Sequence, residues 1–255
     1  MSFKGKMQEA AKSKQSPIIL ALDFPFTATE NRNNILIKAQ KILKDVHPYI
    51  CAVKINHHLT LPLGTFDGVK CLVDQIRAQG LLTIMDAKVN DIGATNQVIA
   101  EYYYAAGFDA IIANPFVGWE EGLKPLFAVS KHLDRGVILL TYMSHKGAGE
   151  GYGQTIVDPF TGQHIPQYVA FAKKAVQWNA DGVVVGATCP EKISEIKHIL
   201  NDNAAIYSPG VGAQGGGAET AIKAGADYLI VGREITQSEN PSEAAKRLCE
   251  AVKSV

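Results

Sequence analysis

The feature that most constrains the fold of this chain is a regular alternation of short apolar runs with helix-length amphipathic segments. Eight runs predict strands, at Pro17–Phe24, Ile50–Asn56, Leu81–Lys88, Ala110–Pro115, Val137–Met143, Gly182–Ala187, Ala205–Pro209 and Tyr228–Gly232. Helical spacing of apolar residues is clearest at Asn31–Asp45, Phe66–Ala78, Thr95–Ala106 and Pro166–Asn179. Several strands are continuously apolar, which is typical of parallel strands that are covered on both faces.

Eight strand–helix units in 255 residues predict a (β/α)8 TIM barrel, a fold of typically ~250 residues. An open, doubly wound α/β sheet is the alternative, because it shows the same alternation. No linker, low-complexity stretch or shift in composition divides the chain, so we expect residues 1–255 to form one domain. Active groups of such barrels lie at the carboxyl ends of the strands, and polar residues follow nearly every predicted strand.

The charge balance argues against two classes of partner. With 25 basic and 25 acidic side chains, the formal net charge is zero, so no general attraction to nucleic acid or to an anionic membrane is expected. No run approaches the ~20 apolar residues of a membrane span, and Met1–Ser16 lacks the apolar core of a secretory signal. The four cysteines are scattered without metal-ligand spacing, which predicts reduced thiols in a cytoplasmic protein.

The segment Asp86-Ala-Lys88-Val-Asn-Asp91 places two acids and an amine at the end of a predicted buried strand. Because side chains alternate between the faces of a strand, Asp86 and Lys88 are expected on the same face. Buried charges are costly unless they are paired or used. A lysine that flanking carboxylates hold protonated can deliver a proton to a developing carbanion, which suits decarboxylation. A structural salt bridge at the barrel rim is the alternative.

Two further charged residues end apolar strands, Asp23 after Leu22 and Lys54 after Val53. Both are expected to reach the mouth of the site, and a salt bridge at the rim is again the alternative. His57 and His58 follow shortly afterwards and have no acidic or cysteine partners at ligand spacing. They are therefore predicted to be loop histidines, and no metal site is expected.

A glycine-rich segment, Ser208–Gly217, follows the seventh predicted strand, and Gly232-Arg233 follows the eighth. Loops at these two positions are the usual phosphate site of such barrels, since glycine lets backbone N–H groups approach an anion. The run 210–215 formally matches GxGxxG. However, a dinucleotide fold needs several strand–helix units after that motif and only about one remains here, so a nicotinamide site is not expected. Ordinary loop glycines are the alternative.

The segment 144–154 that follows the fifth predicted strand is rich in glycine. It is predicted to be too rich in glycine for a stable helix and long enough to close over a ligand. Ser144, at its root, is placed to hydrogen-bond a polar ring. A disordered loop is the alternative, and Tyr152 receives no role.

Together these motifs resemble the orotidine 5′-phosphate decarboxylases, which form UMP and CO2 in the last step of UMP biosynthesis. The resemblance runs from Ile18 to about Arg247 and rests on Leu22-Asp23, Lys54, Asp86-x-Lys88-x-x-Asp91-Ile92-x-x-Thr95, Met143-Ser144, Ser208–Gln214 and Val231-Gly232-Arg233. The chain most resembles the compact, single-function microbial and archaeal form, without an attached phosphoribosyltransferase domain.

The resemblance implies a charge array for catalysis. Lys88 would protonate C6 of the pyrimidine as CO2 leaves, and Asp86 would lie against the substrate carboxylate. Asp91 would complete the array, together with Thr95, from the neighbouring subunit of a homodimer. Lys54 would join the array and also reach the ribose. The resemblance also implies that no metal and no organic cofactor is needed.

The resemblance also implies the substrate contacts. Asp23 would bind ribose hydroxyls, and Ser144 would hold the edge of the pyrimidine. Gln214 would bridge the phosphate and the closing loop, while Gly232 and Arg233 would bind the phosphate. The partner is thus a small nucleotide.

Two alternative functions stay open. Sugar-phosphate enzymes resembling 3-keto-L-gulonate 6-phosphate decarboxylase or hexulose-phosphate synthase share DxKxxD on the same barrel but use Mg²⁺. They would want an additional acidic ligand near the end of the second strand, where this chain has Lys54-Ile55-Asn56. The second alternative is a non-catalytic barrel that binds a phosphate ligand and keeps the charged cluster for stability.

Overall fold

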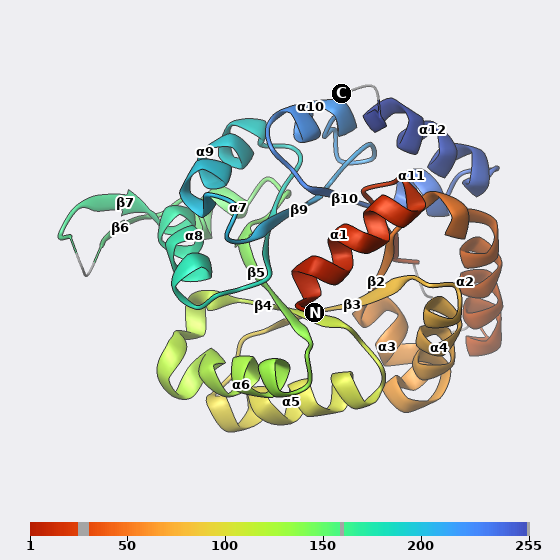
Figure 1. Cartoon of the computed structure of the whole chain (residues 1–255), viewed down its shortest axis with the longest axis horizontal. Helices are drawn as coiled ribbons and strands as arrows, with labels where there is room; N and C mark the ends of the chain where they lie inside the picture. Colours follow the sequence, from red (N-terminus) through yellow and green to blue (C-terminus); the bar gives the residue numbers. More distant parts are fainter. Residues whose placement is uncertain (25–30, 159–160, 254–255) are drawn as a thin grey trace.

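The computed structural model describes residues 1–24, 31–158 and 161–253 and shows a closed barrel of parallel strands (Figure 1). In spatial order the strands are β1 (Ile18–Leu22), β10 (Tyr228–Val231), β9 (Ala205–Pro209), β8 (Gly182–Val185), β5 (Gly136–Tyr142), β4 (Ala110–Ala113), β3 (Leu82–Val89) and β2 (Ala52–Asn56). The first and last of these strands close the ring, since β1 pairs with both β2 and β10. The predicted barrel is confirmed, and the open sheet is excluded.

Helices surround the barrel (Figure 1). The longer ones are α2 (Arg32–Val46), α3 (His57–Leu63), α4 (Lys70–Ala78), α5 (Gly93–Ala105), α6 (Lys124–His132), α8 (Gln167–Gln177), α9 (Pro190–Leu200), α10 (Ala218–Lys223) and α12 (Pro241–Lys253). Short turns are η1 (His47–Tyr49), η2 (Gly64–Val69), η3 (Pro115–Val117), η4 (Trp119–Leu123) and α11 (Arg233–Thr236). The strands are almost entirely buried because these helices cover them.

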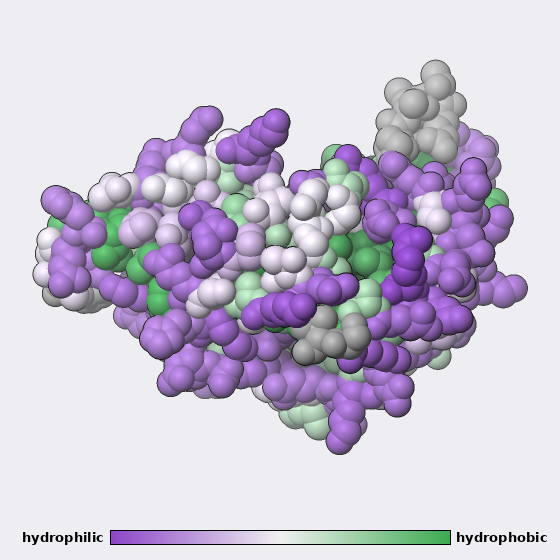
Figure 2. Space-filling model, turned by 90° about the horizontal axis from the view of Figure 1, so that it is seen from above, coloured by the Kyte–Doolittle hydropathy of each residue, from purple (hydrophilic) through white to green (hydrophobic). Residues whose placement is uncertain are grey.

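The outer surface of the helices is mostly polar. Figure 2, seen from above Figure 1, shows a largely hydrophilic face with apolar side chains confined to small areas. Among the described residues, no helix is both long and apolar enough to cross a membrane. The helices therefore direct their apolar sides toward the strands.

Helix α1 (Phe3–Lys14) was not predicted from the sequence, and it lies across one end of the barrel (Figure 1). Its apolar residues Phe3 and Met7 are buried. A Cβ atom on Gly136, at the start of β5, would lie 2.3 Å from the Phe3 ring, so glycine is required for this packing. The backbone N–H of Lys4 donates to Asp181, just before β8. Helix α1 thus covers the amino ends of the strands, opposite the end where a site is expected.

The segment after β5 holds more structure than predicted. One helical turn, α7 (Ala148–Gly151), is followed by an antiparallel hairpin of β6 (Thr155–Val157) and β7 (His164–Pro166). The prediction that this segment is too rich in glycine for a helix was wrong for that single turn. The hairpin projects from the barrel on the left of Figure 1. Directly after β6, the buried Asp158 is tied to α8 by an ion pair of 2.7 Å with Lys173 Nζ.

Candidate active site

A cavity of about 590 Å³ opens at the carboxyl ends of the barrel strands. This volume is in the usual range of about 300–1,000 Å³ for small-molecule sites. Of the residues predicted for the site, the cavity is lined by Asp23, Lys54, Asp86, Lys88, Ser144, Gln214, Gly232 and Arg233. Asp91 and Thr95 do not line it. The structure therefore brings together, within one chain, most of the side chains that the sequence singled out.

The register of three neighbouring strands explains why charged groups meet in this cavity. Lys54 in β2 lies opposite Ala21 of β1 and Ile84 of β3. Asp23 and Asp86 each come two residues after those positions, so both carboxylates extend from the same inner face. The flexible stem of Lys54 reaches up between them.

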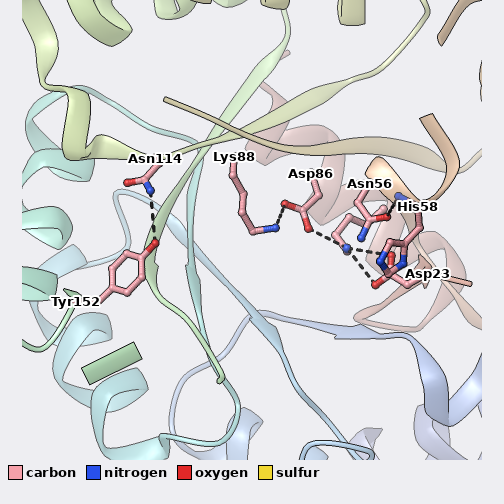
Figure 3. A network of polar contacts seen from close by, with 8 residues as sticks. Asp23, Asn56, His58, Asp86, Lys88, Asn114 and Tyr152 are labelled. Atoms are coloured by element: carbon pink, nitrogen blue, oxygen red, sulfur yellow. Dashed lines mark hydrogen bonds and ion pairs between the residues drawn. The ribbon is translucent and has the colours of Figure 1, made fainter. Parts of the chain in front are cut away.

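The charged groups form a row of alternating sign (Figure 3). Nζ of Lys54 lies 2.9 Å from Oδ2 of Asp86 and 3.4 Å from Oδ1 of Asp23. Nζ of Lys88 lies 2.7 Å from the other carboxylate oxygen of Asp86, Oδ1. Both oxygens of Asp86 thus accept from ammonium groups. The side chain of Lys54 is only 6% exposed, whereas that of Lys88 is 40% exposed and faces the open cavity.

The neighbouring charges set the protonation of the buried pair. Burial alone would raise the pKa of Asp86, but the ammonium groups of Lys54 and Lys88 outweigh burial and lower the pKa of this carboxyl. Burial would likewise lower the pKa of Lys54, yet Asp86 and Asp23 outweigh it and raise the pKa of this amine. Both groups are therefore ionised at neutral pH, and Asp86 holds a fixed negative charge beside Lys88.

The backbone at Lys88 is unusual for a strand. Its φ of 48° lies in the left-handed region, which costs a non-glycine residue about 1 kcal/mol or more. The pairing of β3 with β4 shifts register between Met85 and Val89, as at a bulge. This irregularity directs the ammonium group into the cavity, and no local sequence pattern predicts it.

The opposite part of the cavity carries the glycine-rich loop after β9 and the start of α11. Gly210 has a φ of 95°, and a Cβ there would lie 2.7 Å from the side-chain oxygen of Gln214. Only glycine lets the loop fold back in this way. The guanidinium group of Arg233 is exposed and makes no ion pair or hydrogen bond with a described residue. An unpaired guanidinium beside backbone N–H groups is suited to a phosphate.

Ser144 lies where β5 ends, close to the next strand. A Cβ on Gly186 would lie 2.6 Å from Cα of Ser144, so a glycine is needed for the two segments to pass.

The loop that follows β5 is anchored by Tyr152, a residue without a predicted role. The Tyr152 ring is buried against Phe116, at 5.7 Å between centroids, and its hydroxyl lies 3.5 Å from Asn114. Figure 3 shows this contact at the far side of the site from Asp23.

Asp91 and Thr95 are exposed and lie outside the cavity of their own chain. The carboxylate of Asp91 accepts from the backbone N–H of Ile92 at 2.7 Å. The cluster predicted from Asp86, Lys88 and Asp91 is therefore not assembled within one chain. The expectation that Asp91 and Thr95 act from a neighbouring subunit stays a prediction.

The prediction that His57 and His58 lie in a loop is wrong. They form the first turn of α3, and Asn56 caps that helix by accepting from the backbone N–H of His58 at 2.9 Å. An asparagine before an apolar run is a helix-start signal that would have revealed this element. Of the two, only His58 lines the cavity.

The fold and the site together define a (β/α)8-barrel enzyme with an alternating Lys–Asp array and a free arginine at the other side of one cavity. Residues 16–248 match the sequence family described as orotidine 5′-phosphate decarboxylase / HUMPS. The chain belongs to this family.

Individual relatives and a solved structure show which members of this family the chain is similar to. The chain is 38% identical over 237 residues to an orotidine 5′-phosphate decarboxylase of Methanosarcina mazei, covering 92% of this chain and 94% of that one. It is 38% identical over 239 residues to the enzyme of that name from Thermococcus kodakarensis, with 94% and 98% covered. The crystal structure of orotidine 5′-monophosphate decarboxylase from Methanocaldococcus jannaschii, complexed with the inhibitor BMP, is 34% identical. Its TM-score is 0.76, with 92% of this chain and 97% of that one covered.

The left-handed backbone of Lys88 predicts an inverted order of stability between two variants. Lys88→Gly is expected to be about 1 kcal/mol more stable than Lys88→Ala, because only glycine is unstrained at this φ. In ordinary strand positions the order is the reverse, so Ala87→Gly, at the preceding residue, is expected to lower the free energy of unfolding. Urea denaturation of the three variants measures this. If Lys88→Ala proved as stable as Lys88→Gly, the backbone at this position would not be strained.

The lowered pKa of Asp86 predicts a pH-dependent loss of stability. Asp86→Asn is expected to cost about 3 kcal/mol at neutral pH, because it removes one partner of a buried pair. The stability from ionised Asp86 is present above its ordinary pKa of 3.8 and is lost as the pH falls through the lower folded value. The difference from wild type is therefore expected to be constant from about pH 8 to pH 5 and to shrink below about pH 4.

The control for this measurement is Asp74→Asn, in an exposed pair of 2.8 Å with Lys70. It is expected to change the unfolding free energy by less than about 1 kcal/mol. If Asp86→Asn had an equally small effect at neutral pH, the Lys54–Asp86 pair would not be a stabilising contact.

Proposed function

We propose that this chain acts as a single-domain cytoplasmic enzyme that decarboxylates orotidine 5′-phosphate to UMP and CO2, the last step of UMP biosynthesis. The observation that carries the proposal is the Lys88–Asp86 pair at the end of β3, in one cavity with the free guanidinium of Arg233. The family also includes the proteins described as HUMPS. The relatives cited above, however, are all named orotidine 5′-phosphate decarboxylases.

The positions of the side chains suggest how the substrate lies. The phosphate would bind Arg233 and Gly232, with Gln214 between the phosphate and the loop after β5. The pyrimidine edge would meet Ser144, and C6 would lie against Lys88. Binding energy from the phosphate, which is remote from the breaking bond, would then hold the reacting carbon in place.

The chemistry needs one bond to break and one proton to move. As the bond between C6 and the carboxylate breaks, its electron pair stays on C6 and CO2 departs. The ammonium group of Lys88 donates its proton to C6 and becomes a neutral amine, which regains a proton from solvent through its exposed side. The fixed charge of Asp86 repels the substrate carboxylate and orients the ammonium group of Lys88 toward C6.

The arrangement of carboxylates supports a mechanism without a metal. Asp23 and Asp86 both direct oxygens at the ammonium group of Lys54, so an amine already serves as their counter-cation. The Mg²⁺-dependent alternative would want an acidic ligand near the end of β2, and β2 ends here in Lys54, Ile55 and Asn56. We therefore propose that turnover requires no metal or organic cofactor.

The surroundings of Asp91 support a homodimer with shared sites. Several apolar side chains are more than half exposed on this side of the barrel: Ile92 beside Asp91, Tyr102 near the other end of α5, Leu61 on α3 and Phe66 on η2. Phe66 and Tyr102 pack edge-to-face at 6.0 Å, which joins η2 to α5 in one surface. Exposed apolar patches mark interaction surfaces. A second copy of the chain on this surface would bring Asp91 and Thr95 toward a partner's cavity.

The direct test measures the decrease in the ultraviolet absorbance of orotidine 5′-phosphate after the protein is added in the presence of EDTA. Wild type is expected to turn the substrate over to UMP, and Lys88→Ala is expected to lower kcat by about 10³-fold or more. Lys70→Ala is the matched control, because its side chain is 41% exposed and also paired with an aspartate. Binding of UMP without turnover would instead support the non-catalytic barrel, and turnover of a sugar phosphate that requires Mg²⁺ would support the metal-dependent alternative.

Shared sites predict complementation between inactive variants. Lys88→Ala and Asp91→Ala are each expected to be inactive alone. A heterodimer of the two has one site with both residues intact, so random exchange of subunits is expected to restore about a quarter of wild-type activity. Absence of recovery after exchange has been verified by mass spectrometry would rule out an Asp91 that acts across the interface.

A further inference from the structure

His58 occupies a defined place on the wall of the cavity. Helix α3 begins directly after β2, and its cap at Asn56 fixes the direction of the first turn. In the view of Figure 3 the His58 imidazole overlaps Asp23 at the end of the charged row away from Lys88, and both residues line the cavity. His57, one position earlier on the helix, is exposed but does not line the cavity.

The imidazole of His58 has no partner among the described residues. It is exposed, and it forms no hydrogen bond or ion pair with them. The helix cap uses only the backbone N–H of this residue. A neutral imidazole carries one donor and one acceptor nitrogen, so both are available to a molecule in the cavity.

The order of the site residues indicates which part of a nucleotide His58 would meet. Lys88 marks the reacting end, and Arg233 and Gly232 mark the phosphate end. Asp23 lies between them, since a Cβ on Gly232 would be 3.8 Å from Oδ2 of Asp23. The sugar of a nucleotide joins its base to its phosphate, so the group beside Asp23 and His58 is the ribose.

We propose that His58 is a specificity residue that binds a ribose hydroxyl of the nucleotide. This inference rests on the proposed function for the identity of the ligand. Asp23 can only accept hydrogen bonds from the sugar, and the ammonium group of Lys54 is held by two carboxylates. The ring nitrogens of the His58 imidazole supply the hydrogen-bonding groups that a second hydroxyl requires.

The test compares two proteins and two ligands by equilibrium binding, because binding can be measured whether or not turnover occurs. The dissociation constants of UMP and of 2′,3′-dideoxy-UMP are determined for wild type and for His58→Ala by NMR titration. Wild type is expected to prefer UMP. His58→Ala is expected to weaken UMP binding by about tenfold and to leave the dideoxy compound within about twofold. His57→Ala, the matched control, is expected to match wild type with both ligands.

Each other outcome has a distinct meaning. An equal loss for both ligands would show that His58 supports the helix start and not the sugar, and would overturn the proposal. Unchanged UMP binding would overturn it as well. If wild type also decarboxylates orotidine 5′-phosphate, either result leaves the proposed function intact. Wild type that neither binds UMP nor turns the substrate over would reject both.

Discussion

The buried ammonium group of Lys54 is the interaction on which the arrangement of the site depends. Three adjacent strands supply the array, Asp23 after β1, Lys54 in β2, and both Asp86 and Lys88 in β3, and the barrel register brings these groups together. Burying such a charge without partners would cost several kcal/mol, so Asp23 and Asp86 must stay beside it. Because Asp86 is thereby held ionised, it can orient Lys88 at the one point where the array meets the open cavity.

The parts of the fold that repeat could be predicted from the sequence. Each barrel strand is a local apolar run, and the observed strands lie within a residue or two of the predicted ones. The inner face could be predicted in part: both Asp86 and Lys88 line the cavity as expected, but Lys88 reaches it through the register shift after Met85 and not through regular alternation. The loops after β9 and β10 were identified because glycine and arginine follow strands whose position in the barrel was already known.

The features that escaped prediction depend on contacts between distant segments. Helix α1 is polar overall, and its packing on the barrel depends on contacts with distant residues, such as the fit of Phe3 against Gly136. The left-handed Lys88 results from a register shift between β3 and β4, which no local pattern records. Tyr152 gains its place from Phe116 and Asn114, dozens of residues away. Asp91 is exposed and does not line the cavity of its own chain, so one chain alone does not show its role.

The most direct test of the account is a crystal structure of the protein with UMP bound. The phosphate is expected on Arg233 and the backbone of Gly232, with C6 of the pyrimidine within about 3–3.5 Å of Nζ of Lys88. A base bound at Arg233, or a C6 atom remote from Lys88, would contradict the assignment of the array to proton transfer.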